Sequence, residues 1–221
     1  TAATDDVSVS ANGSGNVLIL TLGPVADVTA NADILSGTGH VTIVASQSAL
    51  FNGTADIRTS GAGTVDVEAG TGNITQSTTS VFSAASDIRL LAAHDVTVGL
   101  VTTLANVSIT AGTGLIIDAD GLVNNANDSN LDIVASGLRL VAGGGIGATI
   151  NHLDTTVGTL TARASSGGIY VNETDGLVIG DVSVTIQRVG SNAGLTLTVD
   201  ATQSDVRTTA GNGNIVLTAG G

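Results

Sequence analysis

The sequence of 221 residues contains no cysteine, methionine, tryptophan or lysine, and has one proline, one tyrosine and two phenylalanines. The lack of cysteine excludes disulfide bonds and any thiolate acting as a nucleophile or metal ligand. Because 42% of the residues are still hydrophobic, the core must be built from Val, Ile, Leu and Ala. Small branched side chains pack well in regular layers, so this composition favours stacked, repeated strands over the irregular core of an ordinary enzyme.

Basic residues are also scarce, since 6 arginines are set against 19 acidic residues and the net charge is −13. An acidic surface repels phosphate backbones and anionic lipid headgroups, so we expect no nucleic-acid binding. No apolar run approaches the roughly 20 residues of a membrane-spanning helix, so we expect no membrane insertion. The chain begins without methionine and ends on Gly-Gly, which suggests a segment of a longer chain whose secretion signal lies elsewhere.

One short pattern, an alternating strand that runs into a glycine turn, recurs along the chain. Residues 106–114 read N-V-S-I-T-A-G-T-G, and similar stretches begin at Thr64, Asp205 and Asn214. Aliphatic or β-branched residues two positions apart indicate half-buried strands, and glycine allows tight turns. We therefore predict an all-β protein, a β-solenoid in the form of a right-handed parallel β-helix, with residues 1–221 as a single repetitive segment.

The length of one solenoid coil has two solutions from the sequence. His40, Asn73 and Asn106 each precede a strand and lie 33 residues apart, and two D-I-R tripeptides that begin at Asp56 and Asp87 lie 31 apart. These distances favour a coil of about 31–33 residues, whereas the roughly ten-residue spacing of strand starts favours about 20. With rungs about 4.8 Å apart, the chain would make roughly 7 to 11 coils. We interpret the D-I-R tripeptides as stacked, solvent-facing charge ladders.

A resemblance to a known family rests on the style of these repeats. The stretch that begins at Leu138 reads L-R-L-V-A-G-G-G-I-G and continues to Asp181, and the chain closes on G-N-I-V-L-T-A-G-G. These stretches resemble the repeat regions of very large bacterial surface proteins of the filamentous-haemagglutinin type. The resemblance implies an extracellular or cell-surface parallel β-helix that serves as an adhesin stalk or fibre. Its implied partners are copies of itself or adjacent segments, stacked end to end, and an extracellular glycan or host surface.

Asp118 and Asp120, in the sequence D-A-D-G, are two positions apart and so share one face of a strand. Together with Asn125 and Asp128 they form a candidate calcium site, because closely spaced oxygen ligands suit a hard cation. The same pair could act as general acid and base on a polysaccharide, as in pectin-degrading enzymes that share the fold. No lysine, aromatic sugar platform or third carboxylate accompanies the pair, so a solvated turn is the simplest interpretation and we predict no enzymatic activity.

Two further sets of residues have both a functional and a structural interpretation. The pairs His94-Asp95 and His152-Asp154 could belong to a catalytic triad, but solvated or turn-capping histidines are the simpler interpretation. Asparagine in an N-x-S/T sequon could carry a glycan, although asparagine is also favoured at turns. The sequons lie at Asn12, Asn52, Asn73, Asn106, Asn127 and Asn172.

The function predicted from these features is structural, as a segment of a secreted bacterial adhesin or extracellular fibre. The main alternative is a pair of immunoglobulin-like or cadherin-like sandwiches bridged by calcium, which would also be acidic and rich in Thr and Val. The single proline, the missing core tryptophan and the lack of a repeat near 100 residues argue against sandwiches. A carbohydrate-active β-helix enzyme is a third interpretation.

Overall fold

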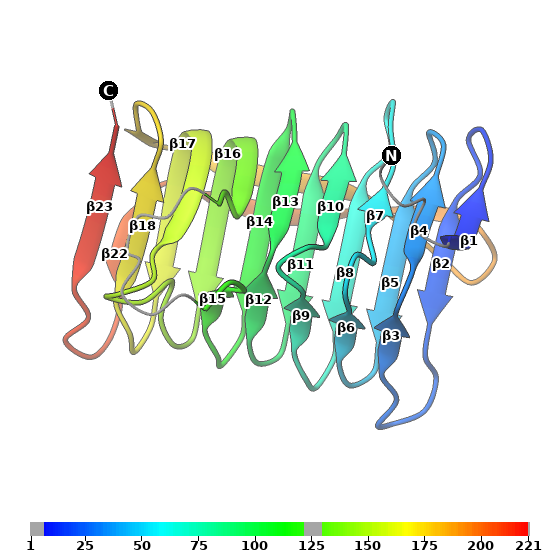
Figure 1. Cartoon of the computed structure of the whole chain (residues 1–221), viewed down its shortest axis with the longest axis horizontal. Helices are drawn as coiled ribbons and strands as arrows, with labels where there is room; N and C mark the ends of the chain where they lie inside the picture. The colour runs from blue at the N-terminus through cyan, green and yellow to red at the C-terminus, as the bar shows by residue number, and fades with distance from the viewer. Residues whose placement is uncertain (1–6, 122–129, 221) are drawn as a thin grey trace.

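The computed structural model of the chain describes residues 7–121 and 130–220, and each regular element in these ranges is a β-strand. The strands wind into a β-solenoid of about 7 turns, with β1 and β23 at opposite ends of the rod (Figure 1). The all-β solenoid prediction is therefore confirmed, and the alternative of two sandwiches is wrong. In the described residues, no helix is long and apolar enough to cross a membrane.

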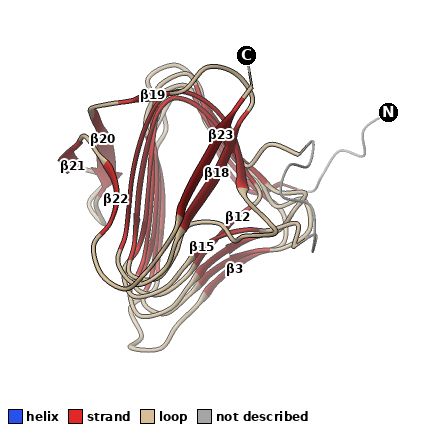
Figure 2. Cartoon of the chain, turned by 90° about the vertical axis from the view of Figure 1, so that its left-hand side faces the viewer, coloured by secondary structure: helices blue, strands red, loops and turns tan. Residues whose placement is uncertain are grey.

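Seen along its axis, the solenoid has three sides, on which strands from successive coils pair in parallel (Figure 2). The first side contains β1 (Val7–Ala11), β4 (Asp33–Ser36), β7 (Ile57–Arg58), β10 (Val81–Ala84), β13 (Leu100–Thr103) and the first halves of β16 (Ile133–Ala142) and β17 (Leu153–Ala164). The second side contains β2 (Val17–Leu20), β5 (Val41–Ala45), β8 (Val65–Ala69), β11 (Ile88–Ala92), β14 (Asn106–Ala111), the second halves of β16 and β17, β19 (Val178–Ile179) and β22 (Val206–Thr208). The third side contains β3 (Val28–Ala30), β6 (Ala49–Phe51), β9 (Ile74–Gln76), β12 (Val96–Val98) and β15 (Ile116–Asp118), and Ile146 links it to β18 (Ile169–Glu173) and β23 (Ile215–Ala219).

The strand register gives the coil length directly. Val41 pairs with Val65, 24 residues further on, and Ile88 pairs with Val107, 19 residues further on. The shorter of the two predicted lengths is therefore correct, and the 31–33-residue coil is wrong. The misleading spacings joined different sides of the solenoid, since the second-side strand β5 follows His40 while the third-side strand β9 follows Asn73.

The interior consists of side-chain stacks that run from coil to coil. On the second side, the pattern V-x-I-x-A places three residues of each strand inward, and the register aligns each with its equivalent in the next coil. All members of the three stacks are buried: Val41, Val65, Ile88, Val107, Leu138 and Leu160; Ile43, Val67, Leu90, Ile109, Leu140 and Ala162; Ala45, Ala69, Ala92, Ala111, Ala142 and Ala164. The recurring N-V-S-I-T-A stretch is thus one second-side strand, β14.

The tight turn after the alanine explains the glycine in the repeat. A Cβ atom added to Gly143 would lie 2.4 Å from the carbonyl oxygen of Gly112 in the preceding coil. Real Cβ atoms do not approach a backbone oxygen so closely, so only glycine lets the two turns stack at the spacing of the coils.

Polar residues at the corners bind the backbone of the neighbouring coil. At the corner before the third side, the Ser48 amide donates to Asp27 Oδ1 (2.9 Å) and the Asn73 amide donates to Ser48 Oγ (3.2 Å). The Asp95 amide then donates to Asn73 Oδ1 (3.0 Å), and the Leu115 amide donates to Asp95 Oδ1 (2.8 Å). These side chains form a corner ladder along the axis, which explains why Asn, Asp and Ser so often precede strands in this sequence.

An antiparallel hairpin covers the second side. The chain leaves the solenoid after β19, forms β20 (Val182–Val189) and β21 (Leu195–Gln203), and rejoins the same rung at β22. The hairpin lies outside the coil (Figure 2), and β20 contacts β5, β8, β11, β14, β16 and β17. It therefore runs along the rod and joins several coils to one another.

The hairpin buries a stack of polar residues that point outward from the second side. The register aligns Thr42, Asp66, Arg89, Ser108, Arg139 and Thr161. Arg89 is only 8% exposed because the hairpin lies over it. The solvent-facing D-I-R ladder is therefore wrong: Ile57 lies on the first side and Ile88 on the second, and the arginine of the second tripeptide is covered.

Candidate functional site

Three aspartates from successive coils meet at the corner between the third and first sides. Asp118 ends β15, Asp132 immediately precedes β16, and Asp154 is the second residue of β17. Each offers a carboxylate oxygen, and these oxygens lie within 4.8 Å of one another. No more than 4% of each residue is exposed. We call Asp118, Asp132 and Asp154 the aspartate cluster.

The fold explains why aspartates gather at this corner. In earlier coils the Asp56 amide donates to Asp33 Oδ1 (3.0 Å), and the Val81 amide donates to Asp56 Oδ1 (2.6 Å). The Asp154 amide donates in the same way to Asp132 Oδ2 (2.8 Å). The cluster is therefore a corner ladder in which a second carboxylate and then a third have come close to the first.

Hydrogen bonds fix the outer members of the cluster. The Asp120 amide donates to Asp118 Oδ1 (2.9 Å), and the Asn172 side-chain amide donates to Asp154 Oδ1 (2.5 Å). Both bonds favour the ionised carboxylate that accepts them, because an N–H dipole stabilises negative charge.

Burial controls the protonation of the cluster. It raises the pKa of Asp132 to about 10, and the negative charge of Asp118 raises this pKa further. Burial also raises the pKa of Asp118 to about 6, against the hydrogen bond from the Asp120 backbone, which lowers it. At neutral pH Asp132 therefore retains its proton while Asp118 is largely ionised, so that the two neighbouring groups differ in charge.

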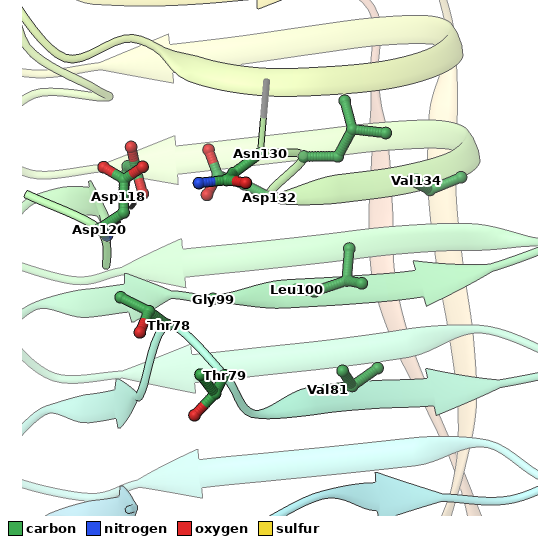
Figure 3. Close-up of a pocket in the computed structure, with 11 residues that line it drawn as sticks. Thr78, Thr79, Val81, Gly99, Leu100, Asp118, Asp120, Asn130, Asp132 and Val134 are labelled. Carbon is green, nitrogen blue, oxygen red and sulfur yellow. Dashed lines mark hydrogen bonds between the residues drawn. The ribbon is translucent and has the colours of Figure 1, made fainter. Parts of the chain in front are cut away.

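A pocket of about 580 Å³ opens beside the cluster. Figure 3 shows Asp118 and Asp120 together at one end, with Asp132 and Asn130 next to them. Hydroxyl groups of Thr78 and Thr79 lie along a lower edge, and the remaining wall is apolar, formed by side chains that include Val81, Leu100 and Val134. The third carboxylate, Asp154, does not line the pocket.

The structure brings together only part of the predicted calcium site. Asp118 and Asp120 are adjacent, but they are linked by a turn hydrogen bond beyond the end of β15. Asn125 and Asp128 lie outside the described residues. Sequence reasoning missed Asp132 and did not connect Asp154 with Asp118. A signal for Asp132 was available, since Asp33, Asp56 and Asp132 all precede an isoleucine at the start of a first-side strand.

The cluster could hold a cation or share a proton, since three close carboxylates cannot all stay charged without compensation. Calcium takes 6 to 8 oxygen ligands at about 2.3–2.6 Å, so the cluster would supply part of a coordination shell. Glycoside hydrolysis needs carboxyl groups about 5–5.5 Å apart, or about 6.5–9.5 Å apart when a water attacks directly. The cluster oxygens, within 4.8 Å of one another, lie closer than either arrangement requires.

The two histidine pairs lie apart from this chemistry. His94 is exposed, and its Nδ1 lies 2.8 Å from Thr113 Oγ1, while Asp95 belongs to the corner ladder described above. His152 is only 6% exposed and its ring centroid lies 5.7 Å from that of Tyr170. The expectation of a solvated or capping histidine therefore fits His94 and is wrong for His152, which is packed inside the protein.

The sequon asparagines occupy different environments. Asn12 and Asn52 are exposed at turns, and Asn127 lies outside the described residues. The other three are half-buried, with side chains engaged in hydrogen bonds. The Asn106 amide donates to the Ser183 carbonyl of the hairpin (3.0 Å). Asn73 is a corner-ladder acceptor and Asn172 binds Asp154. Glycosylation stays a prediction, with Asn12 and Asn52 the most accessible of these positions.

The fold and its corner ladders define a β-solenoid protein. No family model, curated protein or solved structure matches the chain. The similarity to filamentous-haemagglutinin repeats therefore rests on the sequence alone.

Proposed function

We propose that the chain is a structural segment of a secreted bacterial adhesin or extracellular fibre of the filamentous-haemagglutinin type, and that it stacks end to end with adjacent segments or copies of itself. The observation that carries the proposal is the state of the two ends of the solenoid. Within the described residues, β23 pairs only with β18 and β1 pairs only with β4, so each has an unpaired edge.

Both ends of the rod also expose apolar side chains. At one end Ile215 is 44% exposed and Val216 is 36% exposed. At the other end Val7 is 49% exposed and Leu20 is 41% exposed. In the middle of the rod the inward positions of equivalent strands are fully buried by the coils on either side. A further coil at each end would bury these residues and complete the backbone ladders.

The body between the ends supports a mechanical role. Its strength comes from backbone ladders, aliphatic stacks and corner ladders that all repeat along the axis, and the hairpin joins several coils. With a net charge of −13, the outer surface favours solubility outside a cell. An adhesive function would use an extracellular glycan or host surface as its partner.

The polysaccharide-active alternative has one supporting observation, the aspartate cluster beside a pocket. Two features weigh against it: the carboxylates are almost fully buried, and they lie closer together than hydrolysis requires. Incubation with acidic polysaccharides tests this alternative, and release of oligosaccharides would replace the structural proposal with an enzymatic one.

Electron microscopy of the purified chain tests the stacking. We expect rods that join end to end into filaments, and we expect Val216→Lys to leave single short rods because a charge would enter the joint. Leu104→Lys is the matched control, since Leu104 is 89% exposed on a turn in the middle of the rod. Single rods of one length in the unmodified chain would contradict end-to-end stacking. Antibody labelling of intact source cells tests the proposed location, and labelling only after cell lysis would contradict it.

A further inference from the structure

The hairpin presents a second unpaired edge, along the flank of the rod. Within the described residues β21 pairs only with β20, so one side of a nine-residue strand faces away from any other strand. This edge is separate from the ends of the solenoid considered above.

The hydrogen bonds of β20 show which groups of β21 point outward. The amides of Thr185, Gln187 and Val189 donate to side chains of the solenoid, and so point away from β21. In an antiparallel pair, opposite residues direct their backbone groups alike, either toward each other or apart. The residues opposite these three are Val199, Leu197 and Leu195, as listed in that order by the register, and their N–H and C=O groups therefore point to the free edge.

The same three residues carry exposed apolar side chains. Leu195 is 46% exposed, Leu197 is 59% exposed and Val199 is 55% exposed, at alternate positions of the strand. The side chain of Asp200 is turned toward the solenoid, where Oδ1 lies 3.0 Å from Arg89 Nε and Oδ2 accepts from Ser108 Oγ (2.6 Å). Residues 195–199 thus form an uncharged edge without lysine or proline, which are the residues that usually protect an open edge.

We propose that this edge pairs antiparallel with the β21 edge of a second copy of the chain, and so joins two rods side by side. The edge is complementary to itself: a two-fold axis at Leu197 places Leu195 opposite Val199 of the partner copy, and each opposite pair exchanges two backbone hydrogen bonds. The apolar side chains then lie on one face of a four-stranded sheet. The uncharged edge lets two chains of charge −13 approach here, where most of the surface would repel.

The hairpin is fixed firmly enough to serve as a docking edge. Gln203 Nε2 donates to the Leu140 carbonyl (3.1 Å), and Arg139 Nε donates to the Ala201 carbonyl (3.1 Å). Together with the Arg89–Asp200 ion pair, these contacts hold β21 against the rod, so the entropy lost on pairing is small.

Sedimentation velocity tests the pairing, with Leu197→Lys as the disruptive variant and Leu104→Lys as the control. Two lysines would face each other at the axis, so we expect at least a tenfold weaker dimer for Leu197→Lys and no change for Leu104→Lys. A chain that is monomeric at about 100 μM, a hundred times a Kd of about 1 μM, would overturn the proposal. A dimer that survives Leu197→Lys would also overturn it, and loss of that dimer in Val216→Lys would assign it to the solenoid ends.

A cysteine trap provides a second measurement that does not depend on affinity. The chain has no cysteine, so Leu197→Cys introduces a single thiol. Across the axis the Cα atoms would lie about 5.5 Å apart, within the range that a disulfide spans. We expect mild oxidation to link Leu197→Cys into a covalent dimer, at least tenfold faster than Leu104→Cys. Equal rates for the two variants would contradict the proposed pairing.

Discussion

Arg188 Nε lies 2.8 Å from Asp66 Oδ2, and the Asp66 side chain is completely buried although it points outward from its coil. Arg89 Nη1 binds the other oxygen of the same carboxylate at 3.0 Å. One arginine thus comes from the hairpin and the other from the solenoid. The carboxylate fixes the hairpin on the second side, and the hairpin in turn removes the carboxylate from water.

Asp66→Asn is expected to lower the free energy of unfolding by about 3 kcal/mol, because it leaves two arginines partly buried without their shared partner. Chemical denaturation provides the measurement. The matched control is Asp205→Asn, where a 34% exposed carboxylate pairs with Arg163 and the expected loss is below about 1 kcal/mol. Equal losses for the two variants would show that the hairpin contact contributes no more than a surface ion pair.

Ile109→Ala tests the aliphatic stack of the second side. Ile109 is fully buried, and its register neighbours are Leu90 and Leu140. We expect a loss of about 2–5 kcal/mol in the free energy of unfolding, because the cavity lies between coils that cannot collapse without breaking their ladders. Thr110→Ala, at the adjacent half-buried outward position, is expected to cost less than about 1 kcal/mol. A small effect at Ile109 would contradict close packing along the axis.

The aspartate cluster gives a pH dependence of defined sign. Burial raises the pKa of Asp118 to about 6 and that of Asp132 to about 10, so the folded protein holds protons that the unfolded chain releases near pH 4. The contribution of the cluster is therefore complete below about pH 4 and is lost as the pH rises through 6 and toward 10.

Asp132→Asn isolates this contribution, because the amide removes the charge and keeps an oxygen for the Asp154 backbone. We expect the variant to be more stable than the unmodified chain at pH 8, by on the order of 1–3 kcal/mol, and to lose this advantage at pH 4. Thermal denaturation across this range measures the difference. Asp95→Asn, at a corner away from the cluster, is the control. A difference that does not depend on pH would contradict the protonation described for Asp132.

Calcium binding was predicted from the sequence and is tested by adding the ion. We expect calcium to raise the melting temperature by several degrees at neutral pH, since about 1 kcal/mol of binding energy corresponds to about 2–4 °C at this chain length. Asp118→Asn should abolish the shift, and Asp95→Asn should retain it. The absence of a shift in the unmodified chain would remove the calcium prediction and leave the proton as the means of neutralising the cluster.

The local strand unit was predictable because it depends on neighbours in sequence. Alternation of Val, Ile and Ala with polar residues, followed by glycine, identified strands such as β14 and the turns between them. Coil length was not predictable, because residues at different corners look alike: His40 and Asn73 both precede a strand, yet the strands lie on different sides.

The hairpin and the aspartate cluster depend on contacts that the sequence does not display. Residues 195–199 alternate like a solenoid strand, and nothing local shows that they lie outside the coil. Asp118, Asp132 and Asp154 come together only because successive coils place them at one corner. Their outward or corner positions became clear from the register alone.

The central claim is that the chain is a solenoid segment that continues through its ends. Cryo-electron microscopy of a chain carrying two copies in tandem tests it most directly. We predict one unbroken rod, about twice as long, in which strands about 4.8 Å apart continue across the junction between the copies. Two separate bodies joined by a flexible link, with no strand pairing between β23 of the first copy and the second copy, would contradict the account.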